Sequence, residues 1–311
     1  MNTVDTAEKR RRFKARVARK PILVAPGCYD AFSARLVEYA GFEAAYMTGA
    51  GVSAGLAGFP DIGLLTMSEM VEQARRITDA IGLPLISDAD TGYGGALNVY
   101  RTVRQFEAAG VCAIHIEDQE IPKRCGHLEG KRVVSTETMI ERLKAALDAR
   151  IDPNFLIIAR TDARAINGLA DALDRARRYG EAGADVLFVE APEGLAELEN
   201  IGRTLAGRPL FANRGGAEKT PHLSAAELEA LGFSIVIFPG DTQKAAGQAI
   251  LEVLNALKET GNTEALQSKM MGFHNRFELL GMSRYRRLEA AWVADAKAES
   301  ADPTVVINKP L

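Results

Sequence analysis

The chain has 311 residues, of which 47% are hydrophobic and 25% charged, and its formal net charge is −3. These values exclude disordered, collagen-like and fibrous proteins. A charge so close to zero gives no basis for binding nucleic acid or an anionic membrane, so we expect neither partner. No apolar run approaches the roughly 18 residues of a membrane span. Three cysteines provide neither a disulfide framework nor a cysteine-rich zinc site.

The first twenty residues are charged throughout and lack the apolar core of a secretory signal. Arginines are frequent there, but Asp5 and Glu8 argue against a transit peptide. The pattern predicts an amphipathic helix with Phe13 and Val17 on its inner face. We therefore predict a cytoplasmic protein.

Short apolar runs recur along the chain, and each is followed by polar or glycine-rich residues. Most are continuous rather than alternating, which is typical of parallel strands buried on both faces. The eight runs are 22–25, 44–47, 83–87, 112–116, 155–159, 185–189, 210–212 and 234–238.

Segments with helical spacing separate these runs, and three serines precede glutamates as N-caps would: Ser68, Ser135 and Ser224. The alternation predicts a (β/α)8 barrel of the TIM type, with an open doubly wound sheet as the alternative. After Asp241 the pattern becomes helical only, over 242–260, 262–271 and 283–296. We predict one domain, 1–311, with a barrel at about 21–260 and a C-terminal helical appendage at about 261–299.

Acidic residues follow several of the predicted strands. Asp88 and Asp90 follow the third strand and Glu117 follows the fourth. In a barrel these positions meet at one mouth. Such carboxylates repel each other unless a positive charge lies among them, and oxygen ligands suit a hard divalent cation such as Mg²⁺, with Mn²⁺ as the alternative. The competing interpretation is neutralisation by Arg160 and Arg214.

A second cluster lies in the long loop after the fourth strand. Cys125 is preceded by Lys123 and Arg124 and is followed by Gly126 and His127. Neighbouring cations lower the pKa of a thiol, which suits an acid or a nucleophile. Gly126 is expected to make the loop mobile. An ordinary surface loop is the alternative interpretation.

The glycines at 49, 51 and 55 have a spacing only loosely like a dinucleotide-binding loop, and further glycines interrupt the helix that should follow. A nicotinamide enzyme is therefore disfavoured.

Seven short motifs are spread over the chain: YMTG at 46–49, GFPD at 58–61, DADTGYG at 88–94, IEDQ at 116–119, KRCGH at 123–127, ARTD at 159–162 and FVEA at 188–191. Together they resemble the isocitrate lyase and phosphoenolpyruvate mutase superfamily, and the chain is most similar to its 2-methylisocitrate lyase branch. The similarity spans about 21–290. The KRCGH motif is typical of the members that cleave carbon–carbon bonds.

The resemblance implies an α/β barrel, a homotetramer that exchanges C-terminal helices, and a retro-aldol lyase. It implies magnesium held near Asp61, Asp88, Asp90 and Glu117. It also implies that Cys125 protonates the product carbanion while His127 and Lys123 tune the thiol. The remaining implied roles are oxyanion stabilisation by Arg160, positioning by Glu190, and carboxylate binding by Thr48, Gly49, Ala50 and Asn213.

One departure from the family pattern lies after the seventh strand. Lyases of this branch carry a glutamate where this chain has Gly216, and Glu218 comes two residues later. Either this loop is rebuilt, or the second substrate carboxylate is bound differently, with Arg214 as a candidate.

The sequence thus predicts a magnesium-dependent lyase that cleaves a small 2-hydroxy di- or tricarboxylate, such as 2-methylisocitrate, to pyruvate and a second carboxylate. Cleavage of 2,3-dimethylmalate and hydrolysis or decarboxylation of oxaloacetate are the alternatives within the same site. A barrel that only senses an organic acid is the non-enzymatic alternative.

Overall fold

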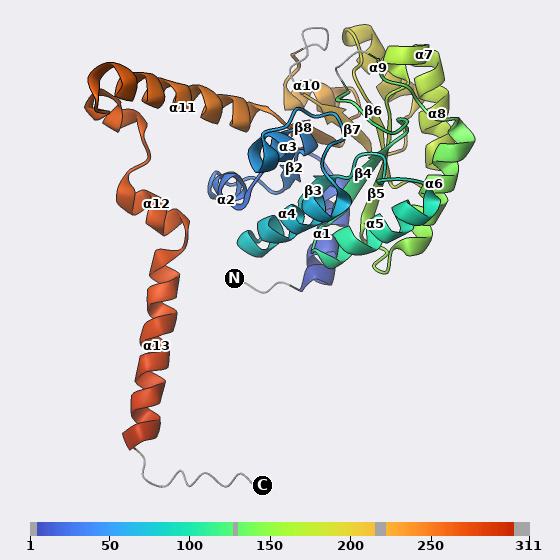
Figure 1. Cartoon of the computed structure of the whole chain (residues 1–311). Coiled ribbons are helices and arrows are strands. Elements are labelled where there is room, and N and C mark those ends of the chain that lie inside the picture. Colours follow the sequence, from blue (N-terminus) through green and yellow to red (C-terminus); the bar gives the residue numbers. More distant parts are fainter. Residues whose placement is uncertain (1–4, 127–129, 215–221, 302–311) are drawn as a thin grey trace, which may run out of the picture. The chain divides into compact units, whose positions relative to one another are not determined.

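The computed structural model describes residues 5–126, 130–214 and 222–301. Eight parallel strands form a closed barrel in chain order, and β1 pairs with β8 to close it (Figure 1). Each predicted run overlaps one observed strand, so the predicted TIM-type barrel is confirmed. The strands are β1 (Leu23–Cys28), β2 (Ala45–Met47), β3 (Leu85–Asp88), β4 (Ala113–Glu117), β5 (Leu156–Thr161), β6 (Val186–Val189), β7 (Leu210–Asn213) and β8 (Ile235–Phe238).

Helices follow the strands and surround the barrel (Figure 1). Ser135 and Ser224 are N-caps as predicted, but Thr66 rather than Ser68 caps its helix, because Glu69 forms a reciprocal capping box with Thr66. The helices of this part are α2 (Ala31–Tyr39), α3 (Gly49–Ala57), α4 (Met67–Ala80), α5 (Ala96–Ala108), α6 (Thr136–Ala149), α7 (Arg164–Asn167), α8 (Leu169–Glu181), α9 (Leu195–Thr204) and α10 (Ala225–Ala230).

The core has two layers. One fills the space between strands and surrounding helices, and the other fills the barrel interior. Phe13 and Val17 of α1 (Thr6–Val17) join the interior layer, as predicted from the amphipathic pattern. Arg10 of α1 donates to the carbonyl of Val111, just before β4 begins. Helix α1 therefore covers the barrel end opposite the one where the strands finish.

The chain divides into two compact units, Met1–Leu251 and Glu252–Leu311. Helix α11 (Asp241–Thr260) begins in the first unit, and the second contains the 3₁₀ helix η1 (Glu264–Lys269), α12 (Phe273–Leu279) and α13 (Met282–Ala301). Between residues 241 and 301 the chain forms helices joined by short connections and no strand, as expected. The single-domain assignment stays a prediction. No helix in the described ranges combines the length and apolar character that crossing a membrane requires.

Candidate active site

A cavity of about 250 Å³ lies where the strands finish, at the barrel mouth. It brings together most of the residues that the sequence analysis singled out: Thr48, Ala50, Asp61, Asp88, Glu117, Lys123, Cys125, Gly126, Arg160, Glu190 and Asn213. Gly49 and Asp90 do not line this cavity, but together with Asp61 they line a smaller pocket. His127, Gly216 and Glu218 lie outside the described residues. The predictions that rest on those three positions stay predictions.

Four carboxylates surround one ammonium group, and we call Asp61, Asp88, Asp90, Glu117 and Lys123 the acidic cluster. The Lys123 ammonium contacts Asp61 Oδ1 and lies 2.7 Å from Asp90 Oδ1. The Asp90 backbone N–H donates to Asp88 Oδ1 at 2.9 Å. Asp90 has φ +46°, in the left-handed region, so the backbone leaves the extended conformation of β3 at this residue. A side chain from the loop after β4 thus supplies the positive charge among the carboxylates.

Burial controls the ionisation of the acidic cluster. It raises the pKa of Asp90 to about 6 despite the opposing charge of Lys123, and it raises the pKa of Glu117 well above its usual range. Burial alone would lower the pKa of Lys123, but the surrounding carboxylates hold that pKa well above its ordinary value. One lysine stays charged among more carboxylates than it can neutralise. The acidic cluster can therefore accept a further cation or a proton.

The donors of the acidic cluster fit a hard divalent cation that needs few protein ligands. Glu117 Oε1 is buried and has no hydrogen-bond partner among the residues described. A Cβ atom at Gly49 would lie 2.5 Å from Asp88 Oδ2, so only glycine leaves that oxygen room. Within the described ranges, no three His, Cys, Asp or Glu side chains converge into a complete metal site. Magnesium, which keeps several waters, suits this arrangement better than zinc.

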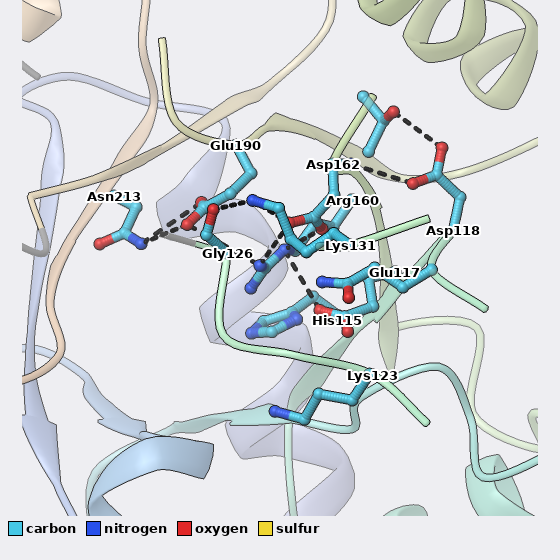
Figure 2. Close-up of polar contacts among 12 residues, drawn as sticks. His115, Glu117, Asp118, Lys123, Gly126, Lys131, Arg160, Asp162, Glu190 and Asn213 are labelled. Atoms are coloured by element: carbon cyan, nitrogen blue, oxygen red, sulfur yellow. Dashed lines mark hydrogen bonds and ion pairs between the residues drawn. The ribbon is translucent and has the colours of Figure 1, made fainter. Parts of the chain in front are cut away.

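Arg160 of β5 links the acidic cluster to the opposite wall of the mouth (Figure 2). Its guanidinium donates twice to Asp162, at 2.9 and 3.0 Å, and lies 3.4 Å from Glu117 and 3.8 Å from Glu190. The Asn213 amide donates to Glu190 Oε1 at 3.1 Å. These contacts fix a buried cation at the cavity wall, where it can face a negative charge on a bound molecule.

The loop after β4 folds over the mouth. The Cys125 N–H donates to the carbonyl of Asp61 at 3.1 Å, and the Cys125 side chain is partly exposed and lines the cavity. A Cβ atom at Gly126 would lie 2.5 Å from both Arg160 Nη2 and Glu190 Oε1. The structure gives Gly126 a role in close packing, beyond the mobility expected from its sequence. The predicted lowering of the Cys125 pKa stays a prediction.

Arg214 does not line the cavity. Its Nη1 lies 2.6 Å from His222 Nδ1, and its guanidinium covers the ring of Phe238 at 5.7 Å. The predicted binding of a second substrate carboxylate by Arg214 therefore gains no support from this geometry. Of the two arginines that were candidates for neutralising the carboxylates, Arg160 lies close enough to do so and Arg214 does not.

Sequence reasoning missed several lining residues. Tyr46 of β2 lines the cavity, and its hydroxyl lies 2.7 Å from His115 Nε2 inside the barrel. Gln243 and Lys244, in the first turn of α11, also line it. Lys244 has no ion-pair partner among the described residues. The signal that would have found Gln243 and Lys244 is the rule already used for the other strands, applied to the end of β8.

Comparisons with known proteins are consistent with this site. Residues 13–258 match the phosphoenolpyruvate phosphomutase family. The chain is 46% identical to 2,3-dimethylmalate lyase of Eubacterium barkeri, over 92% of this chain and 98% of that protein. It is 42% identical to 2-methylisocitrate lyase of Aeropyrum pernix, over 88% of each.

Solved structures are also similar. Oxaloacetate acetylhydrolase in complex with 3,3-difluorooxalacetate superposes with a TM-score of 0.87 at 34% identity, covering 92% of this chain and 97% of that one. Phosphonopyruvate hydrolase in complex with oxalate and Mg²⁺ superposes with a TM-score of 0.83 at 30% identity, covering 92% and 99%.

Proposed function

Because this chain belongs to the phosphoenolpyruvate mutase/isocitrate lyase superfamily, we propose that it is a magnesium-dependent carbon–carbon lyase. Its substrate is a small branched 2-hydroxy di- or tricarboxylate, with 2-methylisocitrate as the leading candidate. The observation that carries the proposal is a single cavity lined by Cys125, Arg160 and carboxylates of the acidic cluster. A thiol, a fixed cation and hard oxygen donors are the groups that this cleavage needs.

Substrate carboxylates have several binding groups available at the mouth. Thr48, which lines the cavity, is the N-cap of α3. The backbone N–H groups in the first turn of α3 therefore lie at the end of the helix that borders the cavity. The Asn213 amide and Lys244 ammonium lie at other parts of the lining. We assign to these groups the binding of the carboxylates that do not take part in the reaction.

Asp61, Asp88, Asp90 and Glu117 would hold the metal, partly through water. When bound, Mg²⁺, or Mn²⁺ as the alternative ion, supplies positive charge that polarises the hydroxyl and carboxylate oxygens of the substrate. Support comes from the unpartnered Glu117 oxygen and from the Mg²⁺ named for the solved phosphonopyruvate hydrolase. The position of Lys123 implies that its ammonium shifts, or shares these carboxylates, when the cation binds.

Each step of the cleavage is assigned to a residue of the cavity. A carboxylate of the acidic cluster takes the proton of the substrate hydroxyl, the adjacent carbon–carbon bond breaks, and the hydroxyl carbon becomes the keto carbon of pyruvate. The bonding electrons pass to the other fragment as a carboxylate-stabilised carbanion. Arg160 faces the developing oxyanion. Cys125 donates a proton to the carbanion, and Glu190 holds Arg160 in place.

Two other substrates have specific support. The 46% identity to a 2,3-dimethylmalate lyase favours that acid, whose cleavage would give pyruvate and propionate. The structural similarity to oxaloacetate acetylhydrolase favours oxaloacetate, whose hydrolysis would give oxalate and acetate.

The products distinguish these substrates. The purified enzyme is incubated with Mg²⁺ and each acid in turn, and the products are identified by chromatography. We expect pyruvate and succinate from 2-methylisocitrate. Turnover of 2,3-dimethylmalate alone would keep the lyase chemistry and change the substrate, whereas oxalate and acetate from oxaloacetate alone would reject the lyase.

Cys125→Ser tests the role of the thiol. We expect turnover to fall about 10²- to 10⁴-fold, because a serine hydroxyl is a far weaker acid than a thiol. Cys28→Ser is the matched control, since Cys28 is buried at the end of β1 and does not line the cavity. Undiminished turnover in Cys125→Ser would remove Cys125 from the reaction. A protein that only sensed the acid would bind it equally well in both variants and turn it over in neither.

We further propose a cytoplasmic homotetramer that folds as one domain and exchanges its C-terminal helices between subunits. Phe273, Tyr285 and Trp292 of the second unit are exposed apolar side chains that such an exchange would cover. Light scattering should then give four times the chain mass of 33.5 kDa. A monomer at micromolar concentration would reject this assembly.

A further inference from the structure

The loop that carries Cys125 is closed at its base by backbone pairing. Two hydrogen bonds of 2.9 Å join segment 118–120 to segment 132–134. Gln119, at the centre of the first segment, pairs with Val133 in an antiparallel bridge. The Arg142 guanidinium of α6 also donates to the carbonyl of Gln119, at 3.2 Å. The backbone of Gln119, the last residue of the IEDQ motif, is therefore fixed at the foot of the loop.

The Gln119 side chain reaches across the loop to the residue that precedes Cys125. Its Nε2 donates to the carbonyl of Arg124 at 2.9 Å, and its Oε1 accepts from the Arg124 N–H at 3.0 Å. Gln119 is 1% exposed, so water competes little for these two hydrogen bonds. One side chain thus holds both backbone polar groups of Arg124.

A second side chain holds the residue that follows Cys125. The Lys131 ammonium donates to the carbonyl of Gly126, as Figure 2 shows, and lies 3.8 Å from Asp162 Oδ1. The Lys131 side chain is buried, and Asp162 is the carboxylate that accepts two hydrogen bonds from Arg160. Lys131 therefore ties Gly126 to the wall of the active-site cavity.

Cys125 lies between these two fixed neighbours, and its own N–H donates to the carbonyl of Asp61. Gln119 and Lys131 do not line the active-site cavity, and the reaction proposed above gives them no task. A thiol that donates a proton to carbon must lie within reach of that carbon, and a displacement of about 1 Å can lower the rate about a hundredfold. The position of the loop backbone is therefore important for the reaction.

We propose that Gln119 and Lys131 are positioning residues for Cys125. They hold the backbone on both sides of it and so keep the thiol where the carbanion is protonated. Neither side chain touches the substrate, because each acts through the loop backbone. This inference rests on the proposed role of Cys125 as the proton donor.

Gln119→Met tests the proposal, because methionine keeps the length of the side chain and removes both hydrogen bonds to Arg124. For pyruvate release from 2-methylisocitrate with Mg²⁺, we expect kcat to fall about 10- to 100-fold and KM to change less than about twofold. Gln105→Met is the matched control, since Gln105 is exposed on α5, and it should behave like the wild type. A wild-type kcat in Gln119→Met would overturn the proposal.

A double-mutant cycle separates positioning of the thiol from general damage to the site. In the Cys125→Ser background, Gln119→Met should lower kcat less than about twofold, because the group that Gln119 positions is gone. A merely structural role would lower kcat by the same factor in both backgrounds. That result would overturn the proposal.

Alkylation of Cys125 by iodoacetamide tests the same contacts without turnover. The rate is measured in EDTA, and the modified residue is identified by peptide mass spectrometry, since Cys28 and Cys112 are buried. We expect the rate at Cys125 to rise at least about threefold in Gln119→Met, because the loop opens more often, and to stay constant in Gln105→Met. An unchanged rate in Gln119→Met would overturn the proposal. A wild type that releases no pyruvate would reject the proposed function and leave this comparison valid.

Lys131→Met covers the case in which Gln119→Met fails to fold. It should lower kcat about tenfold and also accelerate alkylation of Cys125, since one hydrogen bond to the loop is lost. Lys144→Met, at an exposed position of α6, is its matched control and should change neither value. Wild-type kcat and wild-type alkylation in Lys131→Met would overturn the proposal.

Discussion

Two buried carboxylates follow one another at the end of β4, and they differ in how many hydrogen bonds they accept. Glu117 and Asp118 are adjacent in the sequence and are 1% and 0% exposed. Asp118 accepts from the Thr161 hydroxyl at 2.7 Å, the Tyr179 hydroxyl at 2.8 Å and the Asp162 N–H at 2.9 Å, and it pairs with Arg175 at 3.3 Å. Glu117 lies 3.4 Å from Arg160 through one oxygen, and its other oxygen has no partner in the described part of the chain.

The alternation of side chains along the chain places these two carboxylates on opposite sides. Asp118 belongs to what we call the support network, Asp118, Thr161, Arg175 and Tyr179, which joins β4 and β5 to α8. Glu117 belongs to the acidic cluster at the mouth. A satisfied buried carboxylate stabilises the fold, whereas an unsatisfied one is kept at a cost in stability, and the difference marks the functional side.

The largest stability effect is expected in the support network. Asp118→Ala leaves Arg175 buried next to an empty position, so the free energy of unfolding should fall by about 3–5 kcal/mol. Asp171→Ala is the control, since Asp171 pairs with the same arginine at 2.8 Å but is partly exposed, and this variant should lose under about 1 kcal/mol. Urea denaturation measures both. Equal losses of stability in Asp118→Ala and Asp171→Ala would contradict the stabilising role that we assign to the buried Asp118 carboxylate.

Removing a carboxylate from the acidic cluster should raise the free energy of unfolding, whereas removing Asp118 lowers it. The pKa of Asp90 is raised to about 6, so the unfolded chain loses this proton at lower pH than the folded chain does. Stability of the metal-free protein therefore decreases as pH rises from about 4 to about 6, and the penalty persists above that range. Asp90→Asn removes it and should raise the free energy of unfolding by about 2 kcal/mol at pH 7.5.

The control for Asp90→Asn is the same measurement at pH 4, where the wild-type carboxyl is protonated in the folded state and the two proteins should differ little. Thermal and urea unfolding in EDTA provide the values. A destabilised Asp90→Asn variant at pH 7.5 would mean that the Lys123–Asp90 pair supports the fold, and it would place Asp90 with the support network instead.

The smallest effect concerns substrate binding at the mouth. Lys244→Ala should raise KM about tenfold with little change in kcat, because Lys244 lines the cavity without an ion-pair partner in the described chain. Lys258→Ala, an exposed position on the same helix, should leave both constants unchanged. A fall in kcat at constant KM would instead assign Lys244 to the chemistry.

Most of the fold could be predicted because parallel strands buried on both faces leave a clear signal of apolar runs. The helix start at Thr66 was missed, since Ser68 and Thr66 are both good N-caps and only the reach of Glu69 decides between them. The family membership predicted from the motifs is confirmed.

The candidate site could be predicted only in part. Glu117 and Arg160 could be predicted as site residues from their positions at the ends of strands, because a barrel brings such positions together at one mouth. The place of Lys123 among the carboxylates depends on how a long loop folds, which no local pattern encodes. Likewise, the left-handed backbone of Asp90 and the pairing of Tyr46 with His115 result from tertiary packing.

The metal dependence of pyruvate release from 2-methylisocitrate tests the central claim most directly. The rate is measured with Mg²⁺, again after EDTA treatment and desalting, and once more after Mg²⁺ is restored, with circular dichroism recorded at each stage. We predict that pyruvate release stops without the metal and returns with it while the fold persists. Release at an undiminished rate from the metal-free protein would contradict a magnesium-dependent lyase at this barrel mouth.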